Sequence, residues 1–315
     1  MRKTTLLIVI VVSIVLVVVA ARLYVTDADF RLTNPYWNGL NNMARHAGIQ
    51  PLYDLSGLDN AGSGDILMVI SPAVNYTAGE SSQVAAFLGR GGTVVVLDDF
   101  GKANSLLTGI GSPFTIDPVP MCQYENYYVN QSFPTITDIA ATPYTANVSK
   151  LVLNHPAVLN ISGNAVVLAS TSPDAWLDYN DDIWLDYNDR MGIYPVAARY
   201  SAGNGELIVV SDADIFINSM LDKGDNRAFL QDLSRGRVLV DVSHGNAVTP
   251  LGSVYFTLKG DIIAQLTVLL LIIVACIAYI GRDMFIPRLG MIRRSIKNLI
   301  LNRLTVKEKD IKKSD

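Results

Sequence analysis

Four carboxylates lie directly after two apolar segments that are expected to form buried strands. These residues are Asp98, Asp99, Asp212 and Asp214. Ligands of an open α/β sheet bind beyond the carboxyl ends of its strands, so we expect the four to line one crevice. Side chains that converge within about 5 Å would hold a metal ion or serve acid–base chemistry. Side chains that point apart and bond to backbone amides would instead cap the next helix or turn, which is the commoner role of such residues.

A second acidic stretch, residues 176–189, contains the segment WLDYND twice. It places oxygen-bearing side chains at the spacing of a calcium loop, at Asp178, Asn180, Asp182, Asp186 and Asp189. Ca²⁺ is a hard cation that needs several oxygens wrapped around it, so this spacing indicates a Ca²⁺ site. Two features depart from the pattern: Ile183 replaces the usual glycine, and Asp189 is shorter than the usual glutamate. The alternative is an acidic surface loop anchored by its two tryptophans.

The histidines and cysteines do not identify a reaction. His46, His155 and His244 share no metal-ligand spacing, and only His244 has a close carboxylate, Asp241. Cys122 is expected to be a small buried residue and not a nucleophile. No nucleophile elbow, phosphate-binding loop or dinucleotide fingerprint follows a predicted strand.

Four sequons offer acceptors for N-glycosylation if this part of the chain lies outside the cell. Their asparagines are Asn75, Asn130, Asn147 and Asn160.

Apolar runs bounded by glycine or proline predict the strands that would position these residues. The runs are 65–71, 93–97, 194–200, 206–211 and 237–242. Helices are expected to begin at Asn34, after the Thr77–Glu80 capping pair, and near residues 104 and 226. Short connections between alternating strands and helices imply parallel strands, so the fold class is α/β with an open, mostly parallel sheet. Residues 109–145 are expected to form a long loop or insertion, with residues 121–124 as its only compact piece.

Two apolar segments predict membrane spans. Residues 262–280 carry no charge, and residues 6–21 follow the basic start Arg2–Lys3. The first segment along the chain is interpreted as an uncleaved signal anchor, with a cleaved signal peptide as the alternative. Residues 22–261 hold 13 Lys/Arg and 25 Asp/Glu, whereas residues 282–315 hold 10 and 4. The positive-inside rule therefore places both termini in the cytoplasm and the acidic domain outside the cell membrane.

The expected organisation follows from these boundaries. Residues 1–24 form the anchor, 25–245 the extracytoplasmic α/β domain, 246–261 a linker, 262–281 the second span and 282–315 a basic cytoplasmic tail. The tail contains a basic amphipathic segment, which suits either an anionic lipid surface or a protein partner. An acidic domain repels nucleic acid, so none is expected as a partner.

Several stretches together resemble a known family. They are residues 29–48, 91–107, 175–182, 194–221 and 225–233. They are similar to archaeal membrane-anchored proteins of the domain-of-unknown-function family four-three-five-zero, which is related to class I glutamine-amidotransferase-like domains and to gliding-motility auxiliary proteins of ABC transporters. The resemblance implies a flavodoxin-like sheet. It does not imply amidotransferase chemistry, because the segment Leu97–Gly101 lacks the nucleophilic cysteine expected after that strand.

These observations predict a non-catalytic binding or scaffold protein of the cell envelope, with membrane lipid and an envelope protein as partners. The resemblance extends this expectation to a transport-associated assembly. Ca²⁺ is the one cofactor that the sequence suggests. The alternative function is a metal-dependent extracytoplasmic hydrolase that uses the strand-end carboxylates.

Overall fold

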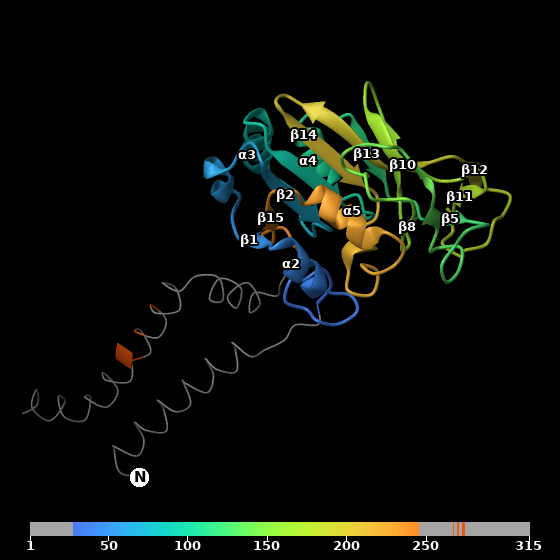
Figure 1. Ribbon diagram of the computed structural model, residues 1–315, viewed down its shortest axis with the longest axis horizontal. Coiled ribbons are helices and arrows are strands. Elements are labelled where there is room, and N and C mark those ends of the chain that lie inside the picture. The colour runs from blue at the N-terminus through green and yellow to red at the C-terminus, as the bar shows by residue number, and fades with distance from the viewer. Residues whose placement is uncertain (1–27, 246–266, 268–269, 271–272, 275–315) are drawn as a thin grey trace, which may run out of the picture. The chain divides into compact units, whose positions relative to one another are not determined.

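The computed structural model describes residues 28–245 together with Thr267, Leu270, Ile273 and Val274 (Figure 1). Residues 28–245 belong to one compact unit, Val25–Thr249. Among the described residues, no helix is long and apolar enough to cross a membrane. The predicted anchor, linker and tail lie outside the described residues, and so does the predicted second span apart from those four positions, which are helical.

An eight-stranded mixed sheet organises the unit, in the order β1-β15-β2-β3-β14-β13-β10-β7. Its first five strands are mutually parallel and the last three are antiparallel. The parallel strands are β1 (Gln50–Leu52), β15 (Arg237–Asp241), β2 (Asp65–Ile70), β3 (Thr93–Leu97) and β14 (Gly205–Val210). The antiparallel strands are β13 (Pro195–Ala202), β10 (Val166–Ser170) and β7 (Asp138–Ile139). The prediction of an α/β chain is confirmed at this level.

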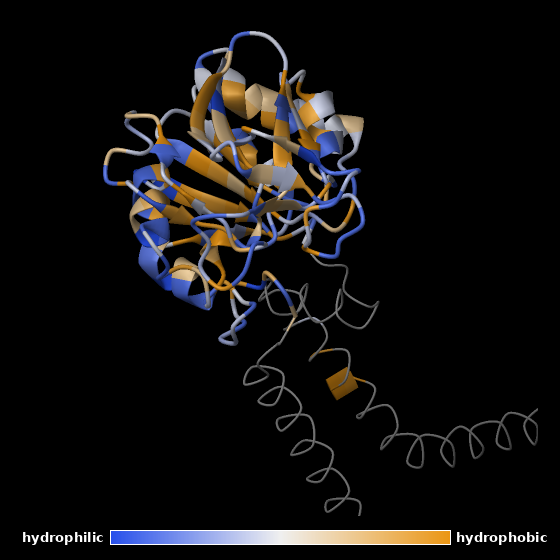
Figure 2. Ribbon diagram, turned by 90° about the vertical axis from the view of Figure 1, so that its right-hand side faces the viewer, coloured by the Kyte–Doolittle hydropathy of each residue, from blue (hydrophilic) through white to orange (hydrophobic). Residues whose placement is uncertain are grey.

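The parallel strands have apolar side chains on both faces because helices cover both sides of the sheet. Alternate residues of each strand enter two separate cores. One core includes residues of α3 (Ala78–Gly89) and α4 (Asn104–Gly109), and the other includes residues of α2 (Asn41–Ala47) and α5 (Asn226–Leu233). Figure 2 shows the central strands coloured as hydrophobic, with hydrophilic residues gathered in the surrounding loops. Two 3-10 turns, η1 (Leu55–Asn60) and η2 (Asp214–Phe216), complete the parallel half.

The predicted start of α3 is confirmed, because Thr77 and Glu80 form both bonds of a capping box. The predicted helix start at Asn34 is wrong, since α2 begins at Asn41. The Asn34 side chain is fully buried and donates to the Ala28 carbonyl at 2.9 Å. The segment before α2 forms turns, in which Trp37 is exposed.

Residues 109–145 are not one long loop, since they contribute to three small antiparallel sheets. These sheets pair β12-β11-β5, β4-β9 and β6-β8. Their strands are β4 (Phe114–Asp117), β5 (Met121–Gln123), β6 (Thr135–Ile136), β8 (Leu151–Val152), β9 (Val158–Ile161), β11 (Ala175–Leu177) and β12 (Arg190–Gly192). The strands are two to four residues long, too short for their alternation to stand out in the sequence.

Candidate functional site

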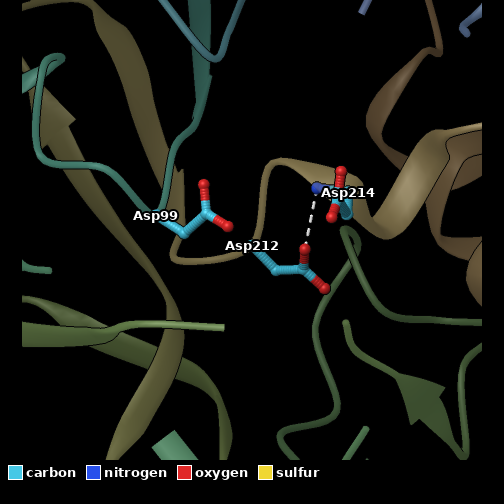
Figure 3. A group of neighbouring side chains, drawn as sticks. All are labelled: Asp99, Asp212 and Asp214. Atoms are coloured by element: carbon cyan, nitrogen blue, oxygen red, sulfur yellow. Dashed lines mark hydrogen bonds between the residues drawn. The ribbon is translucent and has the colours of Figure 1, made fainter. Parts of the chain in front are cut away.

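Three of the four strand-end carboxylates converge at one edge of the main sheet. Asp99 follows β3, whereas Asp212 and Asp214 follow β14, and these two parallel strands are direct neighbours. Each side chain offers an oxygen that lies within 4.8 Å of the others. Figure 3 shows Asp99 reaching from one loop toward the Asp212–Asp214 pair on the other. The structure therefore brings three of the four predicted residues together.

The fourth carboxylate is a cap, as the alternative reading expected. Asp98 is fully buried, and its two oxygens accept the amides of Phe100 at 3.0 Å and Ala103 at 2.8 Å. Its backbone amide also continues the pairing with β14 by donating to Val210 at 3.2 Å. Asp98 thus fixes the turn that presents Asp99.

The hydrogen bonds of the cluster leave part of its capacity unused. Asp212 accepts the amides of Asp214 at 2.7 Å and Asn154 at 2.9 Å. The Asn154 side chain donates to Asp214 at 2.7 Å. The Oδ1 atom of Asp99 is buried and accepts no hydrogen bond from any described residue. A buried acceptor without a partner is costly, so this oxygen marks a place for a donor or a cation.

The three carboxylates are held away from water and close to one another. Burial raises the pKa of Asp99 to about 8, and the charges of Asp214 and Asp98 add to the effect. Burial also raises the pKa of Asp212 well above its ordinary range, and the charges of Asp214 and Asp99 raise it further. The pKa of Asp214 is raised by burial and by Asp29. Three ionised carboxylates are therefore disfavoured here near neutral pH, unless a cation compensates them.

A pocket of about 740 Å³ opens over this cluster. Trp37 and Phe100 contribute part of its apolar wall. Its polar lining residues are Asp99, Asn154, His155, Asp181, Asp214, Ser219 and Lys223. This volume is typical of sites for small ligands, which combine apolar walls with a few polar groups.

Three further residues line the pocket that were not predicted as site residues: Asn154, His155 and Trp37. Residues 153–157 cross the carboxyl edge of the sheet, held by Leu153, His155 and Ala157 amides that donate to carbonyls of other segments. His155 lines the pocket with a backbone φ of 48°, and its Nε2 lies 3.2 Å from the Ser132 Oγ. Such backbone conformations are uncommon outside glycine and often occur at functional sites. No local sequence signal marks this segment.

The predicted calcium loop has some of the expected backbone geometry. Asp178, its first residue, is buried and accepts the amide of Ile183 at 2.7 Å. Ile183 has a φ of 64°, the left-handed conformation that the usual glycine provides. The Asn180 amide group donates to Asp182 at 3.1 Å and to Asp186 at 3.0 Å.

The carboxylates of this loop are nevertheless engaged with donors. Asp189 accepts the amides of Tyr179 at 3.3 Å and Asp186 at 2.9 Å. No three acidic side chains of the loop, which lies wholly within the described residues, bring oxygens within 4.8 Å of one another. Calcium binding by this loop stays a prediction.

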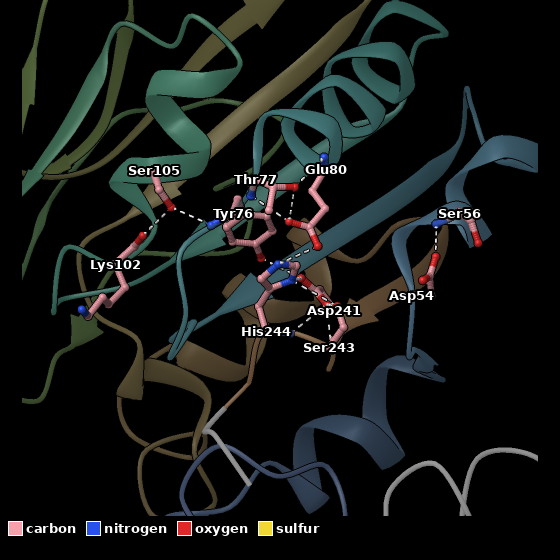
Figure 4. A network of polar contacts seen from close by, with 10 residues as sticks. All are labelled: Asp54, Ser56, Tyr76, Thr77, Glu80, Lys102, Ser105, Asp241, Ser243 and His244. Atoms are coloured by element: carbon pink, nitrogen blue, oxygen red, sulfur yellow. Dashed lines mark hydrogen bonds and ion pairs between the residues drawn. The ribbon is translucent and has the colours of Figure 1, made fainter. Parts of the chain in front are cut away.

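His244 lies in a separate polar network at the end of β15 (Figure 4). Its Nδ1 is 2.7 Å from Asp241 and its Nε2 is 3.3 Å from Glu80. The ring stacks on Tyr76 with centroids 3.8 Å apart, and the Tyr76 hydroxyl donates to Asp241 at 2.7 Å. Burial lowers the pKa of His244, but the hydrogen bonds and charges of Asp241 and Glu80 outweigh it and raise the pKa overall. None of these four residues lines the pocket over the acidic cluster.

Cys122 is a buried residue on β5, as expected. Burial, followed by the charge of Asp178, raises the pKa of its thiol to about 12, which keeps it protonated and unreactive near neutral pH.

The sequon asparagines differ in accessibility. Asn75 and Asn160 are exposed. The Asn147 side-chain nitrogen donates to the buried Asp232 at 2.9 Å, and the Asn130 oxygen accepts from the Ser132 hydroxyl at 2.6 Å.

A family model described as a domain of unknown function, DUF4350, matches residues 34–233. No curated protein matches the chain. Among solved structures, the mmIFT52 N-terminal domain is similar with a TM-score of 0.42 and 19% identity, over 54% of this chain and 76% of that one. A ThuA-like protein from Bacteroides uniformis gives a TM-score of 0.35 and 16% identity, over 58% and 71%. A β-galactosidase from Bacillus circulans gives 0.31 and 17%, over 54% of this chain and only 23% of that enzyme. Likenesses of this extent carry no functional argument.

Proposed function

We propose, from the premise that this chain belongs to the DUF4350 family of unknown function, that its α/β domain binds a ligand through a divalent cation held by Asp99, Asp212 and Asp214. The observation that carries the proposal is the convergence of three carboxylates within 4.8 Å at a pocket of about 740 Å³. Hard divalent cations such as Mg²⁺, Mn²⁺ and Ca²⁺ prefer oxygen ligands of this kind.

The unused oxygen of Asp99 supports a cation over a purely structural cluster. A cation would complete the coordination of that oxygen and favour the ionised form of the three carboxyls, whose pKa values are raised by burial and by neighbouring charges. Three protein oxygens fill only part of the coordination sphere of these metals, so positions remain for water or for a ligand in the pocket.

A place in the cell membrane, with the α/β domain outside and both termini in the cytoplasm, remains part of the proposal. It is supported by the apolar segment 262–280 and by the opposite charge balance of residues 22–261 and 282–315. Leu270 and Val274, within that segment, are helical and exposed, as apolar residues facing lipid would be. Lipid and an envelope protein are the partners that fit this placement, and a nucleic acid is not.

The flavodoxin-like and amidotransferase-like relationships, an archaeal source and a role beside a transporter are also proposals. Five parallel strands with helices in both flanking cores support the first of these. The loop after β3 carries Asp98 and Asp99 and no cysteine, which supports binding in place of amidotransferase catalysis.

Calorimetric titration of the full-length protein in detergent with MnCl₂, MgCl₂ and CaCl₂ tests the cation site. We expect Mn²⁺ or Mg²⁺ to bind with one site per chain and Asp99→Asn to weaken that binding at least about tenfold. Asp59→Asn, at an exposed carboxylate of η1 that does not line the pocket, is the matched control and leaves this site unchanged. Absence of heat with all three metals at millimolar concentration, for a protein with a native circular-dichroism spectrum, would refute the proposal.

The second candidate function is metal-dependent hydrolysis. The convergence of the carboxylates favours it, and His155 lines the same pocket as a group able to exchange protons. The assay is release of p-nitrophenol from its phosphate and acetate esters with Mn²⁺ present. If the protein is a hydrolase, Asp99→Asn and His155→Ala should each abolish this activity. Mn²⁺ binding without turnover of either ester would favour the binding function over hydrolysis.

A further inference from the structure

Exposed aromatic side chains surround the mouth of the acidic pocket. The exposed fractions are 67% for Trp37, 62% for Phe100 and 49% for Tyr128. All three line the pocket above Asp99 and Asp214. Large apolar groups that stay in water beside a concave polar site commonly mark a surface that a ligand covers.

These aromatic residues come from three separate segments, and the backbone of each is held in place. The Trp37 carbonyl accepts the Ser219 amide at 3.0 Å. The Phe100 amide donates to Asp98, and the Tyr128 amide donates to the Phe133 carbonyl at 2.9 Å. The walls are therefore positioned before a ligand arrives, which lowers the entropy cost of binding.

The combination of walls and floor defines the chemistry of the ligand. The walls suit a ring with an apolar face, because aromatic side chains bury such a face well. The floor suits hydroxyl groups, which both donate to carboxylates and coordinate a divalent cation. A sugar ring carries both features at once, with C–H groups on its face and hydroxyls around its edge.

An organic cation is the competing ligand, since aromatic rings and carboxylates also attract ammonium groups. The Lys223 ammonium already lies 4.8 Å from the centroid of the Tyr128 ring. Lys223 is itself a lining residue and supplies a positive charge beside Tyr128, whereas Asp99, Asp181 and Asp214 supply carboxylates to the same pocket. A second cation at that wall would be repelled, whereas a hydroxyl could accept a hydrogen bond from Lys223.

We propose that the pocket binds a hexose unit of a carbohydrate, with the sugar face against Trp37 and Phe100 and its hydroxyls toward Asp99 and Asp214. The floor of this site rests on the proposed function, and the aromatic walls are an independent observation. Carbohydrate is thus the substrate class that we assign to the cation site.

The experiment uses the full-length protein in a detergent without a sugar headgroup, applied to an array of neutral hexose and N-acetylhexosamine oligosaccharides. The strongest glycan is then titrated by calorimetry with Mn²⁺ or with EDTA. We expect binding that Trp37→Ala and Phe100→Ala each weaken at least about tenfold, because each substitution removes one aromatic face from the ring of the ligand. Tyr187→Ala is the control, because this tyrosine is 100% exposed and does not line the pocket.

The outcomes separate this inference from the cation site. Cation binding without any glycan binding would overturn the carbohydrate inference and leave the proposed function in place. Glycan binding that depends on Trp37 but persists unchanged in EDTA and in Asp99→Asn would support the carbohydrate inference and refute the role of the cation. Binding of tetramethylammonium that requires Trp37, with no glycan bound, would identify an organic-cation pocket and overturn the inference.

Discussion

The surroundings of Asp99 differ from those of a carboxylate with a purely structural role. Asp98, its neighbour, has both oxygens satisfied by backbone amides, whereas Asp99 has a buried oxygen with no partner among the described residues. Asp98 turns inward as a cap at the end of the strand pairing, whereas Asp99 lies in the bend that follows and lines the pocket. Their adjacency in the sequence conceals this difference.

The acidic cluster should make the metal-free protein less stable as the pH rises. The pKa of Asp99 in the folded state is about 8, above its unfolded value of about 3.9, and those of Asp212 and Asp214 are raised as well. The folded state therefore binds more protons between these values, and stability falls as the pH rises from about 4 to about 8. Thermal melts in EDTA at pH 5 and pH 8 should show a lower Tm at pH 8.

Asp99→Asn should remove part of this loss. We expect the variant to gain about 1 kcal/mol or more of unfolding free energy at pH 8 and a smaller amount at pH 5, because the amide cannot ionise. Mn²⁺ should raise the Tm of the natural protein at pH 8 and have much less effect on the variant. A Tm that does not change with pH or with Mn²⁺ would contradict the assigned electrostatics.

His244 should contribute stability with a different pH profile. Its pKa is raised in the folded state, so its contribution is complete below the unfolded pKa of about 6.5 and is lost as the pH rises through the folded value. The groups around it are Asp241, Glu80, Ser243 and Tyr76. We expect His244→Gln to lower the unfolding free energy by about 1 kcal/mol more at pH 5.5 than at pH 9.

Urea unfolding of both proteins at the two pH values measures this difference. The comparison is best made with Asp99→Asn as the shared background, which removes part of the acidic cluster's own loss of stability with rising pH. An equal loss at both pH values would show that His244 acts through packing and not through charge.

At the scale of elements, the loop of residues 178–189 takes its turn at a position that glycine would fill more easily. Ile183 has a φ of 64°, and a β-branched residue in this region is strained. Asp181 has a φ of 55°, so the loop reverses through two left-handed residues close together. The loop keeps this shape through bonds such as the Ile183 amide to Asp178, at 2.7 Å.

Ile183→Gly should therefore stabilise the folded chain. The strain relieved is on the order of 1–2 kcal/mol, and the added freedom of glycine in the unfolded chain offsets part of it, so we expect a net gain of about 0.5–1 kcal/mol. If the loop binds Ca²⁺, the same substitution should increase the affinity, which calorimetric titration with CaCl₂ detects. The matched control is Ile193→Gly, an exposed position outside the loop. A net loss of stability in Ile183→Gly would show that this side chain packs favourably enough to outweigh the strain.

For the whole molecule, the membrane placement leads to a labelling prediction in intact cells. Tyr187→Cys should react with a membrane-impermeant maleimide, because this position is 100% exposed and the domain is proposed to lie outside the cell. Ser314→Cys, in the basic tail, should react only after the cells are permeabilised. The natural Cys122 is buried and Cys276 lies in the apolar segment, so both provide low background. The reverse labelling pattern would refute the orientation.

Patterns that repeat over a few residues were readable without coordinates. The apolar runs of β2, β3 and β14 predicted strands, and the Thr77–Glu80 spacing predicted the start of α3. The rule that ligands bind beyond strand ends predicted the crevice, because β3 and β14 carry carboxylates at their ends. These features depend on local periodicity and on general sheet topology, which the sequence encodes directly.

The sequence by itself determined that carboxylates would stand at the ends of two buried strands; the tertiary structure decided that β3 and β14 are neighbours and which three of the four side chains meet. It also decided that Asn154, His155 and Trp37 join them from segments far away in the chain. The physical reason is the sequence separation between the residues that determine each feature. Burial and capping follow from a residue's immediate neighbours, whereas a site at a sheet edge is assembled by strand pairing and loop crossings between residues separated by tens to more than a hundred positions.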